Sequence, residues 1–154
     1  MDHGWWTFDF TRDRQRGTLS AVNTNAIWVS YAALLRVEGA AFIHDELTRR
    51  LGVPDECINR PPGKLRSLWA MKSRAPAGSD INVHLAWLAE LVERNSDFLR
   101  EIVVSGVPVA LRLECNTNLD YALVGFDAFL FKAFVSTGIA IEFYAGLESS
   151  NVAS

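Results

Sequence analysis

Apolar residues recur at helical spacing over residues 79–104, and the period changes to two soon afterwards. The apolar positions of the first part lie three, four or seven residues apart and share one helical face: Ile81, Leu85, Leu88, Val92, Leu99 and Ile102. Residues 109–115 then alternate, which is typical of a strand with one buried face. Ser96 followed by Asp97 restarts a helix amino terminus, so two consecutive helices fit as well as one bent helix. The pattern therefore predicts helical cover over a sheet, followed by one strand of that sheet.

The same two periods predict the other elements of the chain. Further strands are expected at residues 26–38, 67–73 and 139–144, and further helices at 41–51 and 126–135. Gly52 and Pro54 end the first of these helices and Gly138 ends the second, because glycine suits the position after a helix and proline cannot continue one. Residues 53–66 are expected to form a loop, and residues 116–125 a loop or a hairpin.

The order of the predicted elements is strand, helix, strand, long helix, strand, helix, strand. It predicts an α+β fold with a mostly antiparallel sheet of four to five strands and helices packed on one face. A ferredoxin-like split βαβ arrangement is the expected topology, and a small doubly wound α/β sheet is the alternative. A single α+β domain is expected over residues 26–145, followed by a polar tail at residues 146–154.

Residues 1–25 form an aromatic segment ahead of this domain. Trp6, Phe8 and Phe10 alternate with polar residues, which predicts a short strand. One interpretation is an edge strand that is added to the sheet. The other is an N-terminal aromatic arm that docks on a partner or joins two subunits into a homodimer.

Composition and charge narrow the class of protein. A chain of 154 residues with a net charge of −3 fits one acidic domain, which argues against nucleic acid as a partner. The charge is uneven, because residues 1–74 carry 11 Lys and Arg against 8 Asp and Glu, a net +3, whereas residues 75–154 carry 4 against 10, a net −6. Two cysteines are too few for a disulfide framework, and neither a signal peptide nor a membrane-spanning run is recognised. A cytoplasmic protein without a membrane partner is therefore expected.

Four local patterns accompany these elements: Leu51-Gly52-Val53-Pro54; Gly63-Lys64 leading to Trp69-Ala70-Met71-Lys72-Ser73; the long helical segment with its following strand; and the run from Ser136 through Gly138 to Tyr144. Together with the order of the elements, these patterns resemble the bacterial domain-of-unknown-function family 4279. The resemblance covers residues 26–144 and leaves the N-terminal segment unexplained. It implies this fold, and it brings no activity, cofactor or catalytic residue to the chain.

The residues that could carry chemistry are scattered along the sequence. His3, His44, His84, Cys57 and Cys115 show no short paired spacing, so no metal site is predicted. Phosphate-binding glycine patterns are also absent from the sequence, and no cofactor is expected. His44 is interpreted as part of an exposed helix start, and Cys115 as a structural thiol on the apolar face of its strand.

Two charged groups remain as candidate binding sites. Arg60, Lys64 and Arg66 flank a Pro-Pro-Gly turn before Trp69, and could hold an anionic ligand or an acidic partner surface. A solvated loop that protects a sheet edge is the alternative interpretation. The second group is an acidic partner patch on the long helical segment, where the alternative is an ordinary solvated face: Glu90, Glu93, Asp97 and Glu101.

Three hypotheses for the function follow. The first is a non-catalytic interaction module that binds another protein, for instance as an immunity protein that masks the basic surface of a toxin. The second is a sensor for a small anionic ligand, with a pocket near Arg60, Lys64, Arg66 and Trp69. An enzyme of unrecognised mechanism is the third.

Overall fold

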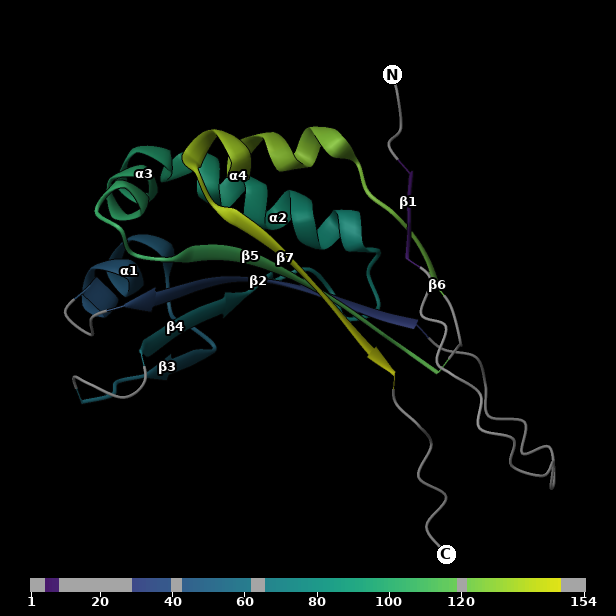
Figure 1. The fold of residues 1–154 in the computed structure, drawn as a ribbon, viewed down its shortest axis with the longest axis horizontal. Coiled ribbons are helices and arrows are strands. Elements are labelled where there is room, and N and C mark those ends of the chain that lie inside the picture. Colours follow the sequence, from purple (N-terminus) through teal and green to yellow (C-terminus); the bar gives the residue numbers. More distant parts are fainter. Residues whose placement is uncertain (1–4, 9–28, 40–42, 62–65, 119–121, 148–154) are drawn as a thin grey trace, which may run out of the picture.

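The computed structural model describes residues 5–8, 29–39, 43–61, 66–118 and 122–147 (Figure 1). The strands are β1 (Trp5–Phe8), β2 (Val29–Gly39), β3 (Glu56–Ile58), β4 (Ser67–Lys72), β5 (Val109–Thr117), β6 (Ala122–Gly125) and β7 (Ala140–Leu147). The helices are α1 (His44–Leu51), α2 (Ile81–Arg94), α3 (Ser96–Val104) and α4 (Lys132–Thr137), with a short 3-10 helix, η2 (Ala128–Phe131), before α4.

Five of the strands form one sheet in the order β3-β4-β2-β5-β7. Its pairs are antiparallel except for β5 and β7, which run parallel. The helices lie along one face of this sheet (Figure 1), so the predicted α+β class and the mostly antiparallel sheet are confirmed. The strand order differs from a ferredoxin-like split arrangement, because β5 and β7 are direct neighbours, whereas a split unit places another strand between them.

The core lies between the centre of the sheet and α2. The register sets Leu35 of β2 between Met71 of β4 and Leu111 of β5, and all three side chains are buried. The six apolar residues that were predicted to share one helical face are also buried: Ile81, Leu85, Leu88, Val92, Leu99 and Ile102. Burial of each such side chain contributes about 1.5–3 kcal/mol to folding.

The ends of the helices follow from local chemistry. The Asp80 carboxylate accepts a hydrogen bond from the backbone N–H of Asn82 at 2.9 Å and caps α2. Asn95 separates α2 from α3, so of the two alternatives that the sequence left open, the structure has two consecutive helices. Gly138 adopts a φ of 82°, and the N–H of Ile139 donates to the carbonyl of Phe134 at 3.0 Å, which closes α4.

Two pairings were not predicted from the sequence. β3 lies in the segment expected to be a loop and pairs antiparallel with β4. It was not predicted because a strand of three residues with mostly exposed side chains is too short to show a hydrophobic period. β6 pairs antiparallel with β1 in a separate two-stranded sheet. The N-terminal strand expected at an edge of the main sheet therefore has β6 as its partner, and the rest of residues 1–25 lies outside the described residues.

Several helices and strands also begin or end at other residues than predicted. The strand predicted at residues 26–38 is described from Val29 to Gly39, and its first three predicted residues lie outside the described part. The helix predicted at residues 126–135 begins as η2 and continues as α4. β7 reaches Leu147, so the predicted polar tail begins later than residue 146.

Replacing Val92 by alanine is expected to lower the free energy of unfolding by about 2 kcal/mol, because two fully buried methyl groups are lost beneath α2. The matched control is Val83→Ala on the same helix, where the valine is 48% exposed. This control should be neutral or slightly stabilising, since alanine is the better helix former. Urea unfolding curves measure both effects, and equal losses in the two variants would contradict this packing.

The ion pairs of Glu46 with Arg49 and Arg50 on α1 predict a pH dependence of stability. Hydrogen bonds from Arg49 and then Arg50 lower the pKa of Glu46 from 4.5 to about 2. Because the folded-state pKa is depressed, the stabilisation by Glu46 is full above pH 4.5 and is lost as the pH falls toward 2. The difference in unfolding free energy between the wild type and Glu46→Gln should shrink over that interval. The same substitution in an Arg49→Gln/Arg50→Gln background should give no such change; a pH-independent difference in the wild-type background would count against the ion pairs.

Candidate functional site

The residues predicted to hold an anionic ligand are not gathered around an exposed ring. Trp69 is fully buried in β4, and its indole N–H donates to the Thr48 hydroxyl at 3.1 Å. The register pairs Trp69 with Val37, which sets its side chain on the helix-covered face. Arg66 is exposed and Arg60 is partly buried. Lys64 lies outside the described residues. The aromatic platform expected beside these charges is therefore a core residue.

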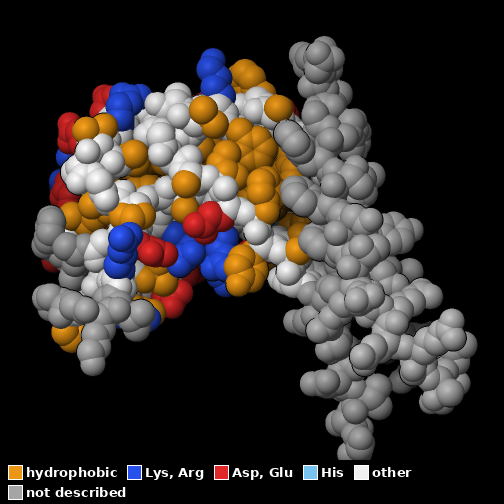
Figure 2. Space-filling model, in the orientation of Figure 1, with side chains coloured by type: hydrophobic (Ala, Val, Ile, Leu, Met, Phe, Trp, Pro, Cys, Tyr) orange, Lys and Arg blue, Asp and Glu red, His pale blue; other side chains and the backbone are white. Residues whose placement is uncertain are grey.

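The four carboxylates of the predicted acidic patch are exposed on α2 and α3. Glu90 lies 3.7 Å from Arg94, and Asp97 lies 3.2 Å from Arg100. No ion pair of Glu93 or Glu101 is found among the described residues. Figure 2 accordingly shows acidic and basic side chains interspersed over the α3 end of the molecule. The helix face is mixed in charge, with a net excess of acid.

The sheet face opposite the helices carries its own charge pairs. Arg36 lies 2.8 Å from the carboxylate of Glu38 and 3.4 Å from that of Glu142. Arg112 Nε lies 3.4 Å from Glu114 Oε1, an ion-pair distance without hydrogen-bond geometry. Arg112 also stacks over the ring of Tyr144 at 3.9 Å from its centroid. Because each arginine faces a carboxylate, this face is largely neutralised by its own residues.

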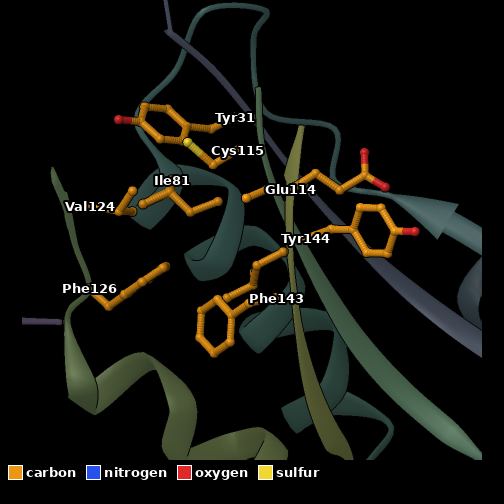
Figure 3. Close-up of a pocket in the computed structure, with 10 residues that line it drawn as sticks. Tyr31, Ile81, Glu114, Cys115, Val124, Phe126, Phe143 and Tyr144 are labelled. Atoms are coloured by element: carbon orange, nitrogen blue, oxygen red, sulfur yellow. The ribbon is translucent and has the colours of Figure 1, made fainter. Parts of the chain in front are cut away.

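A cavity of about 180 Å³ lies where the amino end of α2 meets the carboxyl ends of β5 and β7 (Figure 3). Its lining comes from β2, α2, β5, β6, β7 and the residue after β6: Tyr31, Ile81, Leu113, Glu114, Cys115, Val124, Phe126, Phe143, Tyr144 and Ala145. The side chains of Glu114 and Tyr144 point away from it in Figure 3, since they belong to the opposite face of the sheet. The wall is therefore almost entirely apolar.

Two phenylalanines of the cavity wall, Phe126 and Phe143, belong to a cluster of three aromatic rings. The ring of Phe126 lies 5.2 Å from that of Phe143 and 5.7 Å from that of Phe131, both in tilted or edge-to-face geometry. Phe143 is 46% exposed. Figure 2 shows hydrophobic side chains gathered on the face where η2 and β7 lie. Apolar surface thus continues from the cavity to the outside of the molecule.

The polar groups in the cavity wall are neutral at physiological pH. Burial raises the pKa of the Tyr31 phenol, and Cys115 and Asp80 add to this shift. Burial likewise raises the pKa of the Cys115 thiol. The cavity therefore suits an uncharged apolar group better than the anion expected from the sequence.

Both described histidines are buried, in contrast to the exposed helix start expected for His44. The Nδ1 atoms of His44 and His84 contact Asn59 and the Ser73 hydroxyl, respectively. Neither contact is with a carboxylate. In the described part of the chain, no group of three or more His, Cys, Asp or Glu is placed to hold a metal ion.

Sequence reasoning placed Ile81 on the apolar face of a helix, and Leu113 and Phe143 within predicted strands, but did not predict the cavity. The missing information is the position of β6, which brings Val124 and Phe126 to the other wall. β6 lies in a segment expected to be a loop or a hairpin, and no local period indicates that β1 is its partner.

No family model, curated protein or solved structure matches the chain. The resemblance to the domain-of-unknown-function family 4279 therefore stays a prediction. None of the described helices has the length and apolarity needed to cross a membrane.

Proposed function

We propose that the protein is a non-catalytic interaction module that binds another protein, and that the cavity receives an apolar side chain of this partner. The observation that carries the proposal is the uncharged cavity of about 180 Å³, which is continuous with the exposed ring of Phe143. Apolar pockets that take one large side chain are typical anchor sites of protein interfaces.

The volume favours a side chain over a free metabolite. Pockets for drug-sized ligands measure roughly 300–1,000 Å³, whereas a cavity of about 150 Å³ accommodates a benzene ring. A space of about 180 Å³ therefore fits one aromatic or branched aliphatic group. A sensor for a small ligand is the second candidate, and the apolar wall favours an apolar compound for it.

The neighbouring strand offers a second kind of contact. β7 is the last strand of the five-stranded sheet, and β5 is its one partner among the described residues. An extended segment of a partner can add a strand to such an edge, with alternate side chains entering adjacent pockets. Phe143 belongs to β7 and also lines the cavity, so backbone pairing and side-chain capture would occur side by side.

The excess of acid on α2 and α3 favours a basic partner. Residues 81–104 hold four carboxylates and two arginines, a net charge of −2. Such a surface attracts a basic partner over long range and accelerates association. Masking the basic surface of a toxin, as an immunity protein does, is one concrete form of this function.

Filling the cavity is expected to abolish partner binding without unfolding the protein. Val124→Phe adds an aromatic ring at the cavity wall, and Val135→Phe makes the same change on α4, where the valine is 66% exposed. Affinity capture from the native host, quantified by mass spectrometry, should recover at least about tenfold less of the specific partner with Val124→Phe, whereas Val135→Phe should match the wild type. Thermal unfolding checks that both variants fold. Equal recovery with both variants would refute the role of the cavity.

Removing unpaired acid from α2 and α3 is expected to slow association with that partner. Glu93→Gln/Glu101→Gln should reduce the association rate by roughly threefold to tenfold at low salt, with a smaller effect at high salt, because electrostatic steering is screened. Asp45→Asn/Glu56→Gln changes the net charge equally with exposed residues of α1 and β3. Surface plasmon resonance with the captured partner measures both rates. Identical rates for the two double variants would rule out steering by the acidic helices.

A further inference from the structure

Cys57, His44 and Asn59 form a side-chain cluster at the β3 edge of the sheet, the edge opposite β7. Cys57 lies in β3, and His44 is the first residue of α1. The register sets Cys57 opposite Trp69, so the thiol lies on the helix-covered face, beside α1. Cys57 is exposed, whereas His44 is only 3% exposed. An exposed cysteine residue therefore meets a buried imidazole.

One ring nitrogen of His44 contacts both of its neighbours. Nδ1 lies 2.8 Å from Asn59 Oδ1 and 3.4 Å from Cys57 Sγ. Nε2 is buried and has no hydrogen-bond partner among the described residues. A neutral imidazole carries one proton, and a buried N–H without an acceptor is costly. The proton therefore belongs on Nδ1, which donates to Asn59 and faces the sulfur.

We propose that Cys57 is a nucleophilic thiol that forms a mixed disulfide with small-molecule disulfides, and that the Nδ1–H of His44 stabilises the negative charge on its sulfur. A thiolate is the attacking species in thiol–disulfide exchange. The Nδ1–H of His44 donates to Asn59, and its positive end also lies beside Cys57 Sγ, because Nδ1 is 3.4 Å from that sulfur. A positive dipole end at this distance attracts a negatively charged sulfur. Asn59 is a positioning residue, since its carbonyl holds the proton of His44 on Nδ1.

The exchange balances without another reactant. Cys57 gives its thiol proton to water, and its Sγ attacks one sulfur of the disulfide. The new S–S bond forms as the old one breaks, and the departing thiolate takes a proton from water. Cys57 is oxidised, and the departing sulfur is reduced.

Cys115 provides an internal reference for this reactivity. It lines the cavity and is partly buried, and burial raises the pKa of its thiol. A buried thiol in apolar surroundings reacts slowly. Cys57 should therefore react clearly faster with a disulfide than Cys115 does.

The test uses the full chain and dithiobis(nitrobenzoate), a disulfide whose released thionitrobenzoate is followed by absorbance. Its negative charges disfavour entry into the apolar cavity that Cys115 lines. Peptide mass mapping assigns each reaction to Cys57 or Cys115, and Cys57 should react at least about tenfold faster. His44→Gln should lower the reaction rate of Cys57 by about tenfold, because the imidazole N–H beside the sulfur is removed. His84→Gln is the matched control, since His84 is also buried but contacts Ser73, the residue after β4. This control should leave the rate of Cys57 within about twofold of the wild type.

A wild-type rate in His44→Gln would overturn the proposal, and so would equal slowing by His44→Gln and His84→Gln, which would indicate a general loss of packing. A nitrogen NMR spectrum of the wild type provides a second test that requires no folded His44 variant. The imidazole proton of His44 should reside on Nδ1, and the Nδ1 resonance should shift in Cys57→Ser. A proton on Nε2, or an unmoved resonance, would also overturn it.

Discussion

The packing of α2 across the centre of the five-stranded sheet is the contact on which the rest of the structure depends. Leu85, Leu88 and Val92 of α2 are fully buried, as are Leu35 and Leu111 on the sheet. The helices lie on one face, so the apolar side chains of the sheet depend on this single layer for their cover. Burial of this apolar surface is the main stabilising contribution available to a domain without a disulfide between its cysteines.

The cavity lies at the amino end of α2, beyond which this helix no longer covers the sheet. α2 begins at Ile81, which is itself part of the cavity wall, while β5 continues to Thr117 and β7 to Leu147. The sheet is therefore longer than the helix that covers it. Phe126 and the β6 strand reach across part of the remaining surface, and the space between them and the sheet stays open. A gap of this origin is apolar because it is lined by the same strand face that forms the core elsewhere.

Much of the fold could be predicted because the central elements have clear local periods. The helical stripe from Ile81 to Ile102 and the alternation from Val109 onward each decide which side chains face the core. The pairing of β1 with β6 could not be predicted in this way, because it joins residues that are far apart in the sequence. The candidate site could not be predicted for the same reason, because the wall formed by Val124 and Phe126 depends on the position of β6.

Trp69 shows why composition misled at the basic segment. A tryptophan beside arginines and a lysine resembles a binding platform, yet a strand sends neighbouring side chains to opposite faces. Pairing with Val37 sends Trp69 into the core and Lys72, three residues later, to the surface. The contact between His44 and Cys57 was missed for the opposite reason. The two residues are thirteen positions apart in the sequence, but their side-chain atoms lie 3.4 Å apart. Only the β3–β4 pairing, which the sequence does not signal, brings that thiol beside α1.

The two edges of the sheet differ in a way that bears on function. β3 is three residues long and carries an exposed glutamate, and short charged edges resist pairing with other chains. β7 is eight residues long, has Glu142 as its one charged residue, and exposes Phe143 and Tyr144. An edge of that length with exposed aromatic rings invites pairing with another chain. The β3 edge has the polar cluster of Cys57, His44 and Asn59, whereas the β7 edge has apolar surface beside a cavity. The proposed thiol chemistry at the first edge and the proposed protein binding at the second therefore draw on different residues, and either proposal can fail without the other.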